Sequence, residues 1–578
     1  MLAASAGFQT SRGFRLLVMS PQPKSHRKAL EATLLAFAVL IGFIRVWAAR
    51  NTINPDGISY LDVGDAYLGG HWTGAISDHW SPLYPWLLGA SLKILKPPAA
   101  WEFPAAHFTT FVIYLVALLC FRLFWAALIR HHVGRLGEYQ KMEIVALPEP
   151  VWIALGYLVF TVSSVEFVNL EYVGADMCVA AIVYLISAVL LRLHTSPTAP
   201  RKYLLLGVLL GFGYLAKAVM LPLSVVFILA ALPVRAGFRK ILLSAAATAV
   251  GLALIASPYV WALSKHQGHL TYSESGNLQY AWTVNNLPFW WAGESSGFGT
   301  PIHPRTKIFD QPLVYTFEGP LRGTYPGWYD PTYWLAGIKS HFNLRQQLVR
   351  LKLNSQIIFG FFFGVFQIAL VAGVLIWYLF GAGRFPWFAG LRDYWYLVLP
   401  PLAAAAVYWP LWVEPRYIAP FLGLFWAGIF SGVRMPDSPE SRRLVSCMPA
   451  AVVPLTLAVV LASTVGAVDQ IGTAPPTQFQ VAEYLHRIGI RPGDRVGAIG
   501  RVMECGWARL ARVQITTEIN HGSDAAFRAS SVPVRSAAIA AMFSTGVRAI
   551  ISDSREDSGC PSGWRSAAGT GFSVCTPR

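Results

Sequence analysis

The sequence predicts a polytopic α-helical membrane protein with a small α/β domain after its last span. The first observation is composition: 54% of the 578 residues are hydrophobic and only 13% are charged, whereas a soluble protein carries about 25% charged residues. The second is that apolar runs of the length needed to cross a bilayer, roughly 17–25 residues, recur along the chain. The third is that basic residues gather in alternate loops.

The apolar runs define the spans that we expect. There are eleven, near residues 29–49, 105–129, 150–165, 175–191, 203–216, 219–234, 241–262, 354–380, 393–412, 417–433 and 444–466. We expect the first to stay uncleaved rather than to act as a signal peptide, because Arg45 interrupts the place where an apolar stretch should end.

The basic loops predict the orientation. Six segments that we place on one side hold nineteen Lys and Arg residues: 1–28, 130–149, 192–202, 235–240, 381–392 and 434–443. The short loops on the other side hold five: Arg50, Lys93, Lys96, Lys217 and Arg416. Because Lys and Arg accumulate in cytoplasmic loops, segment 1–28 is predicted to be cytoplasmic and the C-terminus to lie outside. The net charge of +16 then reflects membrane orientation, and we expect no nucleic-acid partner.

Three segments outside the spans lie on the predicted outer side, namely 50–104, 263–353 and 467–578. The first contains "NPDGISYLDVGDAYLGG", which predicts a helix capped by Asn54, begun by Pro55 and ended by Gly69-Gly70. The stretch "SPLYPWLLGASLKIL" is short for a span and predicts an interfacial helix. Aromatic residues in this stretch and just before it are expected at headgroup depth: Trp80, Tyr84 and Trp86.

The tail, 467–578, alternates helical and strand patterns. "QFQVAEYLHRIG" and "VRSAAIAAMFSTG" have helical patterns, whereas "DRVGAIG", "RVQITTEI" and "VRAIISD" have strand patterns. This alternation predicts a small extracytoplasmic α/β accessory domain after a transmembrane domain that spans residues 29–466. In an oxidising compartment Cys560 and Cys575 are expected to form a disulfide, with Cys505 left over.

Four places on the outer side carry ionisable residues near the membrane, where such residues are functional candidates. Asp56 lies in the first turn of the helix after the first span, whereas Asp62 and Asp65 are expected on its solvated face. Glu171 and Asp176 lie between the third and fourth spans, either in a site or in an ordinary polar loop. Lys217 either snorkels or holds an anion, and Arg416 either pairs with Glu414 or binds phosphate.

These residues give the chain a resemblance to a known class. An Asp in the first outer loop followed by "SYLDVGDAYLGGHW" and "SPLYPWLLG" resembles the GT-C multispan glycosyltransferases. The relatives are the RgtA/B/C/D-like bacterial enzymes, the protein O-mannosyltransferases and the lipid A aminoarabinose transferases. "LLLGVLLGFGYLAKAVMLPL" and "EPRYIAPFL" are similar to later motifs of these families. Asp56 is followed by Gly57, whereas the families commonly have a second acid there.

The resemblance implies a GT-C-like transmembrane bundle and a cell-envelope enzyme of the bacterial inner membrane. It would move a hexose or pentose from a polyprenyl-phosphate carrier to a hydroxyl of a lipid, glycan or protein acceptor at the outer face. Asp56 would be the general base, Glu171 or Asp176 a second acid, and Lys217 and Arg416 the partners of the donor phosphate. We expect no cofactor and no metal, although Asp56 with Glu171 or Asp176 offers oxygen ligands for Mg²⁺ or Mn²⁺.

Two other classes stay open at this stage. A secondary transporter would have inverted repeats and spans broken at corresponding places, and only one span here looks broken. A non-enzymatic lipid-binding protein would not need its outer acids. No P-loop is present, which argues against ATP as an energy source.

Overall fold

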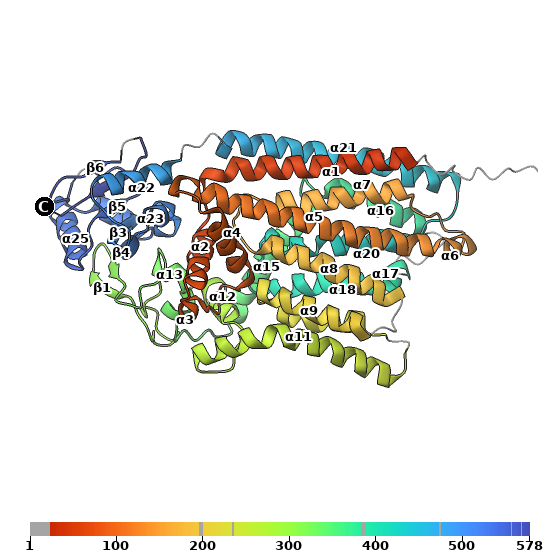
Figure 1. Ribbon diagram of the computed structural model, residues 1–578, viewed down its shortest axis with the longest axis horizontal. Coiled ribbons are helices and arrows are strands. Elements are labelled where there is room, and N and C mark those ends of the chain that lie inside the picture. Colours follow the sequence, from red (N-terminus) through yellow and green to blue (C-terminus); the bar gives the residue numbers. More distant parts are fainter. Residues whose placement is uncertain are drawn as a thin grey trace, which may run out of the picture.

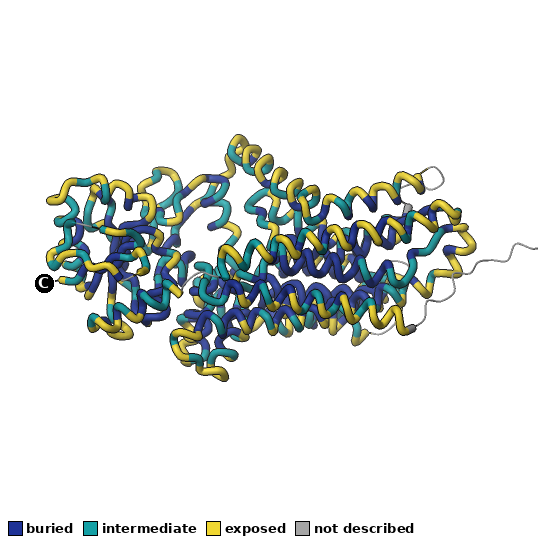
Figure 2. The backbone as a smooth tube through the Cα atoms, turned by 90° about the horizontal axis from the view of Figure 1, so that it is seen from above, coloured by how far each residue is buried: buried dark blue, intermediate teal, exposed yellow. Residues whose placement is uncertain are grey.

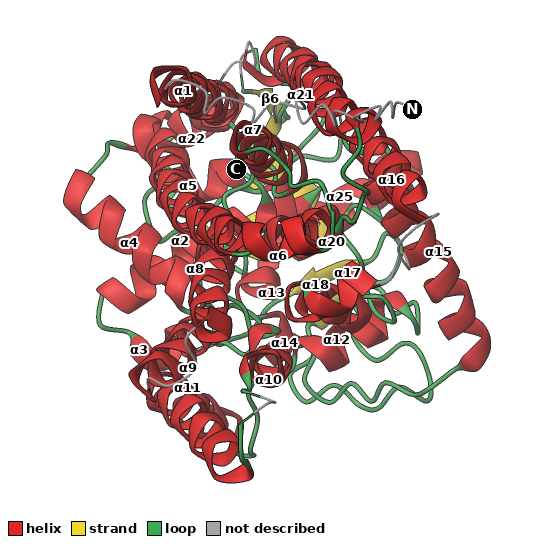
Figure 3. Cartoon of the chain, turned by 90° about the vertical axis from the view of Figure 1, so that its right-hand side faces the viewer, coloured by secondary structure: helices red, strands yellow, loops and turns green. Residues whose placement is uncertain are grey.

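The computed structural model describes residues 24–195, 200–233, 236–382, 389–472, 476–556, 558–567 and 569–577. Most of the predicted cytoplasmic segment 1–28 lies outside these residues. The described chain forms a long helical bundle with an α/β domain at one end (Figure 1). Seen along the length of the bundle, α4 and α15 lie at opposite edges (Figure 3).

The bundle is built from helices that run side by side. They are α1 (Lys24–Ala48), α5 (Glu102–Gly134), α7 (Glu149–Thr161), α8 (Asp176–Thr195), α9 (Pro200–Ala216), α10 (Met220–Ala231), α11 (Phe238–Gln267), α15 (Leu344–Phe363), α16 (Ile368–Ala382), α18 (Trp395–Tyr408), α20 (Leu422–Gly432) and α21 (Pro439–Ala467). Buried residues form a band through the middle of the bundle and a second group in the α/β domain (Figure 2).

Each of the eleven predicted spans coincides with one of these helices or with a bent pair. Within the described residues, six helices are long and apolar enough to cross a membrane, or seven if α15 and α16 count as one span. The chain is therefore a multi-pass membrane protein, and the count of eleven stays a prediction. One detail was wrong: the span expected at 354–380 is two helices bent by 78°. The first ends at Gly364, whose backbone is extended, so the helical ladder is broken there.

Short helices cover the two ends of the bundle. At the end near the α/β domain lie α2 (Pro55–Leu68), α3 (Trp72–Ala75), α4 (Leu83–Leu95), α12 (Ser275–Thr283), α13 (Pro326–Tyr329), α14 (Pro331–Trp334) and α19 (Pro415–Ile418). At the far end lie α6 (Leu136–Lys141) and α17 (Ala389–Asp393). The two helices expected in the first outer segment are thus present as α2 and α4.

The aromatic residues around α4 do not all lie where we expected. Trp80 and Tyr84 are buried in the protein rather than exposed at headgroup depth, and only Trp86 is half-buried. Both buried rings pack edge-on against Tyr60 of α2, with ring centres 5.1 and 5.0 Å away. These side chains are therefore buried by packing against α2 and do not reach the lipid interface. This packing also supports α2, the helix that carries Asp56.

Helices α9 and α11 pack closely through glycines. A Cβ at Gly207 would lie 2.0 Å from the Thr248 carbonyl oxygen, and one at Gly251 would lie 2.3 Å from the Leu204 carbonyl oxygen. Small residues at such positions let membrane helices approach backbone to backbone. This contact fixes the position of α9, and therefore of Lys217 just after its end.

The α/β domain contains one seven-stranded sheet in the order β1-β2-β4-β3-β5-β7-β6. Its strands are β1 (Thr306–Phe309), β2 (Val314–Thr316), β3 (Arg495–Gly500), β4 (Gln514–Asn520), β5 (Ile550–Ser552), β6 (Arg565–Ser566) and β7 (Ser573–Cys575). Its helices are α22 (Thr477–Arg487), α23 (Gly506–Ala511), α24 (Asp524–Ala529) and α25 (Val532–Ser544). The helices and strands predicted for the tail are confirmed, as is the disulfide between Cys560 and Cys575.

The edge of this sheet comes from a distant part of the chain. Strand β2, in segment 263–353, pairs antiparallel with β4, placing Tyr315 opposite Glu518. Strand β4 in turn pairs in parallel with β3. Segment 263–353 and the tail therefore share one sheet and lie at the same end of the bundle, as their common predicted side requires.

A buried arginine joins the α/β domain to α2. Arg509 of α23 contacts Asp62 at 2.7 Å, Asp65 at 2.6 Å and Glu102 at 2.6 Å, and we call these four residues the Arg509 cluster. Asp62 also accepts hydrogen bonds from the backbone N–H and the hydroxyl of Thr324. The expectation that Asp62 lies on a solvated face was wrong, because this face of α2 is covered by the domain. Asp65 remains half-exposed.

We expect Arg509→Met to weaken the contact between the domain and the bundle. It would leave Asp62 and Glu102 buried without their main cation, and breaking such a buried pair typically costs about 3–5 kcal/mol. Arg512→Met is the control, because Arg512 also contacts Glu102, at 2.8 Å, but is 44% exposed. An exposed pair contributes about 0–1 kcal/mol. Thermal unfolding followed by tryptophan fluorescence should separate the two variants, and equal melting temperatures would contradict the role of Arg509.

Candidate active site

The start of α2 is fixed by a neighbouring loop. Asn54 occupies the predicted cap position, but its side chain does not cap the helix. Its Oδ1 instead accepts the N–H of Val173 at 2.9 Å, and its Nδ2 donates to the Val173 carbonyl oxygen at 3.4 Å. These two bonds bring the first turn of α2 beside the loop that precedes α8, and therefore bring Asp56 toward Asp176.

Asp56 forms an ion pair with Arg416, whose Nη1 lies 3.1 Å from Asp56 Oδ2. Both side chains are partly accessible, at 21% and 16% of their full surface. Burial raises the pKa of Asp56 above its ordinary value, and this effect exceeds the lowering by Arg416. Glu414 and Asp176 raise the pKa further through their negative charge. Asp56 is thus a stronger base than a free aspartate, despite its place at a helix N-terminus.

Asp176 and Lys217 join the same group. Asp176 is the first residue of α8, and its Oδ1 lies 2.5 Å from Lys217 Nζ. Its other carboxylate oxygen is 3.8 Å from Arg416 Nη1. Lys217 sits in the break between α9 and α10, where its backbone N–H donates to the Gly213 carbonyl oxygen. The break between α9 and α10 therefore delivers a cation to the site.

Glu414 completes the set, which we call the Asp56 cluster: Asp56, Asp176, Lys217, Glu414 and Arg416. Glu414 Oε2 is 2.5 Å from Arg416 Nε, and its Oε1 accepts the indole N–H of Trp412 at 2.7 Å. The local Glu–Arg pair is therefore present, but it occupies only the Nε of Arg416. The same guanidinium also contacts Asp56, and phosphate binding by Arg416 stays a prediction.

Tyrosine rings cover the cations. Lys217 Nζ lies 3.8 Å from the ring centre of Tyr417. The Arg416 guanidinium carbon lies 5.2 Å from the Tyr417 ring and 5.3 Å from the Tyr172 ring. These are cation–π distances, and the rings restrict the orientations of both cations. Sequence reasoning did not assign Tyr172 or Tyr417 a role, although Tyr417 follows Arg416 in "EPRYIAPFL" and was therefore within reach.

Glu171 lies in a different group. Its Oε1 is 3.1 Å from Arg45 Nε, and Arg45 also contacts Glu166 at 3.7 Å. Of the two second acids that the sequence suggested, the structure brings Asp176 to Asp56 and pairs Glu171 with the last turn of α1. The reason is local: Asn54 holds Val173, so residues on either side of it diverge toward α8 and α1.

In the described part of the chain, no three His, Cys, Asp or Glu side chains are arranged to hold a metal ion. Asp56, Asp176 and Glu414 are instead arranged around Arg416. The cluster has an accessible carboxylate with raised basicity beside two fixed cations. Such a set can take a proton from a hydroxyl while it stabilises negative charge on a departing group.

Comparison with known proteins identifies the fold. No family model and no curated protein matches this sequence. ArnT from Cupriavidus metallidurans bound to undecaprenyl phosphate is similar at a TM-score of 0.52 and 12% identity, over 94% of this chain and 97% of that chain. The same ArnT in the apo state gives 0.51 at 12% identity, over 95% and 98%. The oligosaccharyltransferase of Archaeoglobus fulgidus, in complex with zinc and sulfate, gives 0.47 at 12% identity, over 90% and 68%.

The predicted fold is thereby confirmed. The chain is a multi-pass membrane protein with the GT-C fold, and ArnT matches it over nearly the full length of both chains. The Asp56 cluster lies at the end of the bundle that the α/β domain covers.

Proposed function

We propose that the chain is a membrane glycosyltransferase that moves a sugar from a polyprenyl-phosphate carrier to an acceptor hydroxyl. The observation that carries this proposal is the contact of Asp56 with Arg416, which adjoins Asp176 and Lys217. One group can accept a proton and the others can hold a phosphate. The likeness to ArnT bound to undecaprenyl phosphate supports a polyprenyl carrier.

In the proposed reaction the acceptor hydroxyl gives its proton to the Asp56 carboxylate. The hydroxyl oxygen forms a bond to the anomeric carbon as the bond from that carbon to the carrier phosphate breaks. The phosphate leaves with the bonding electron pair, and Lys217 and Arg416 stabilise its added charge. The chain's own residues suffice for each proton and charge in this scheme.

Both cations retain capacity for a phosphate. Among the described residues, Arg416 uses Nε and Nη1 for its carboxylate partners, which leaves Nη2 for a phosphate oxygen. Lys217 is 27% exposed and has two further N–H donors beyond the one directed at Asp176. The carboxylates hold the cations in position before the donor arrives, which reduces the reorganisation that binding requires.

The location proposed is the bacterial inner membrane, with the N-terminus in the cytoplasm and the α/β domain in the periplasm. The distribution of basic loops supports this orientation. A carboxylate at the end of the bundle suits a lipid-linked donor, because the reacting carbon is attached to a phosphate at headgroup depth. The scaffold alternative assigns no role to an accessible carboxylate beside two positioned cations.

Asp56→Asn should lower turnover by about 10²–10⁴-fold, the usual contribution of a general base. Asn has almost the same shape and can still accept a hydrogen bond from Arg416, so stability should change little. Glu171→Gln is the matched control, because Glu171 belongs to the Arg45 group. Transfer from a radiolabelled polyprenyl-phosphate sugar in nanodiscs measures both. If Asp56→Asn kept near wild-type turnover and Glu171→Gln lost it, the general base would be Glu171 in the second outer loop and not Asp56.

The pH profile should carry the signature of the raised pKa. Asp56 works when deprotonated, so kcat/KM should fall as the pH drops through its pKa, above the ordinary aspartate value of about 3.9. Arg416→Met removes the largest influence that lowers this pKa, so its acid limb should move to higher pH. An acid limb that stays unchanged in Arg416→Met would contradict the pairing of Arg416 with the base.

Lys217→Met should weaken donor binding by at least roughly tenfold, since it removes one charge-assisted contact to phosphate. Met keeps much of the apolar stem beside Tyr417, and Asp176 remains in contact range of Arg416. Binding of polyprenyl phosphate, measured by displacement of a fluorescent analogue, tests this directly. Lys265→Met provides a control at an exposed lysine outside the cluster. Equal affinities of Lys217→Met and wild type would leave Lys217 as a partner of Asp176 alone.

A further inference from the structure

A second concave site opens between segment 263–353 and the α/β domain. It is a cleft of about 280 Å³, close to the lower limit of about 300 Å³ for small-molecule sites. We call it the Trp290 cleft. One wall is aromatic and comes from the outer segment: Phe289, Trp290, Trp291, Tyr325 and Trp334. A second, more polar wall comes from β3, β4 and the residues that follow them: Gly500, Arg501, Val502, Met503, Glu504, Glu518, Asn520 and His521.

The cleft reaches the helix that carries the candidate base. Pro55, the first residue of α2, lines it, and Asp56 is the next residue along the chain. Aromatic contacts continue from the cleft to α2: Phe289 lies against Trp328, which packs on Trp80. The Trp328 carbonyl oxygen accepts the hydroxyl of Ser59 in α2. A molecule in the cleft would therefore extend toward Asp56.

The polar wall stands at the carboxyl ends of parallel strands. Strand β3 ends at Gly500 and β4 ends at Asn520, and both ends line the cleft together with Arg501 and His521. The chain passes from β3 to β4 on one side, then crosses to β5 on the other side of β3. Ligands bind outside the carboxyl ends of parallel strands at such a point of reversal.

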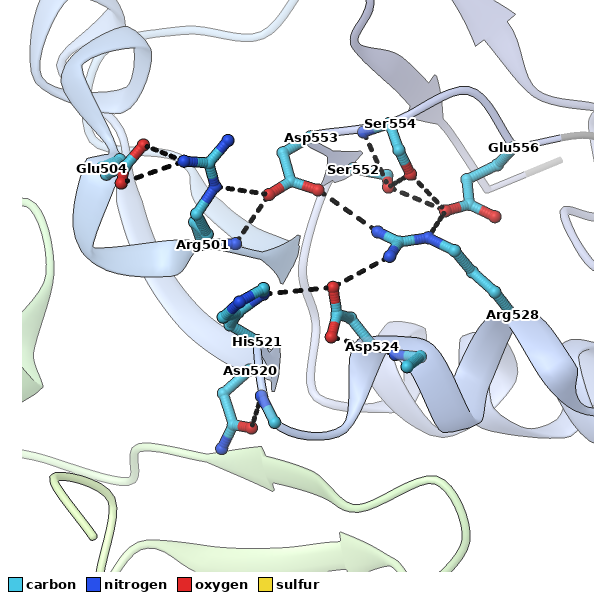
Figure 4. A network of polar contacts seen from close by, with 12 residues as sticks. Arg501, Glu504, Asn520, His521, Asp524, Arg528, Ser552, Asp553, Ser554 and Glu556 are labelled. Atoms are coloured by element: carbon cyan, nitrogen blue, oxygen red, sulfur yellow. Dashed lines mark hydrogen bonds and ion pairs between the residues drawn. The ribbon is translucent and has the colours of Figure 1, made fainter.

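A network of ion pairs holds these strand ends in place (Figure 4). Arg528 contacts Asp524 at 2.8 Å, Asp553 at 3.2 Å and Glu556 at 3.2 Å. Asp553 also accepts the backbone N–H of Arg501 at 2.7 Å. The loops after β3, β4 and β5 are thus tied to one another, which gives the cleft a fixed polar edge.

The charges that line the cleft are balanced. Arg305 is paired with the fully buried Glu518, which also accepts the hydroxyl of Tyr325 at 2.7 Å. Arg501 is paired with Glu504 at 3.3 Å. His521 lies 3.5 Å from Asp524. Each cation on this wall has a nearby carboxylate among the described residues, so the lining of the cleft carries no surplus charge.

The lining also contains buried donors that lack an acceptor. Within the described chain, Arg305 Nη2, Asn520 Nδ2 and the indole N–H of Trp291 have no hydrogen-bond partner. All three side chains belong to residues that are more than nine-tenths buried and line the cleft. Buried donors without partners are costly. A ligand rich in neutral oxygen acceptors, with a small adjustment of these side chains, would satisfy them.

From this we infer that the Trp290 cleft binds the acceptor substrate, and that this acceptor is a neutral saccharide. A sugar ring has an apolar C–H face that stacks on aromatic rings, and hydroxyls at its rim that pair with carboxylate, amide and guanidinium groups. The cleft offers both walls and no surplus charge. The inference rests on the proposed glycosyltransferase function, since it supplies the acceptor hydroxyl that Asp56 deprotonates.

The test is a glycan array that carries neutral oligosaccharides beside phosphorylated and uronic-acid-containing ones. Full-length protein in nanodiscs with a fluorescent scaffold is applied as wild type, Trp290→Ala and Trp72→Ala. Trp72 is a control tryptophan that is 57% exposed and does not line the cleft. Wild type and Trp72→Ala should bind the same neutral glycans. Trp290→Ala should bind them at least about tenfold more weakly, because it loses one stacking ring.

The outcomes separate this inference from the proposed function. Binding of no glycan, binding of anionic glycans alone, or equal binding by Trp290→Ala would overturn the acceptor site, even if sugar transfer from a polyprenyl-phosphate donor is observed. The array contains no sugar donor and measures glycan binding alone. Absence of sugar transfer in the separate donor assay would therefore count against the proposed function and not against the acceptor site. A folded Trp290→Ala, judged by its melting temperature, is required for the comparison. Glu504→Gln gives an independent check, since Arg501 would keep only Asp553, at 4.0 Å, as a carboxylate partner and should add binding of anionic glycans.

Discussion

Arg509 fixes the geometry on which both sites depend. It lies almost fully buried between Asp62 and Asp65 of α2 and Glu102 at the start of α5. A buried guanidinium is tolerated only where carboxylates compensate for its lost hydration. The α/β domain therefore packs on α2 in one orientation. Because Asp56 is on the same helix, this contact positions the candidate base relative to the carboxyl edge of the sheet that lines the Trp290 cleft.

Helix α2 is held at both ends by polar contacts from distant parts of the chain. At its start Asn54 binds Val173 and Asp56 binds Arg416, while its later turns contact Arg509. Tyr60, between them, packs on Trp80 and Tyr84. Of the three acids that follow the first span, Asp62 and Asp65 are thus structural, whereas Asp56 faces Arg416. The spacing of Asp56, Asp62 and Asp65 on the helix decides which acid has which environment.

Sequence reasoning predicted much of this arrangement because its signals were local. Apolar runs predicted the bundle helices, and alternating patterns predicted β3, β4, β5, α22 and α25. Five candidates were chosen for being ionisable near a membrane, namely Asp56, Glu171, Asp176, Lys217 and Arg416, and all except Glu171 meet in the Asp56 cluster. Asp62 was misjudged because its partner, Arg509, lies 447 residues away, and no local pattern reports such a contact. For the same reason β1 and β2 could not be assigned to the sheet of the tail.

The two sites divide the chemistry by charge. The Asp56 cluster holds two cations that keep N–H donors beyond those used by their carboxylate partners, which suits a phosphate that gains charge during the reaction. The Trp290 cleft carries no surplus charge and offers aromatic faces, which suits a neutral ring. Raised basicity at Asp56 depends on burial, and a saccharide lying along Pro55 would exclude water from the carboxylate and deepen that burial. Acceptor binding would then strengthen the base at the moment when it is needed.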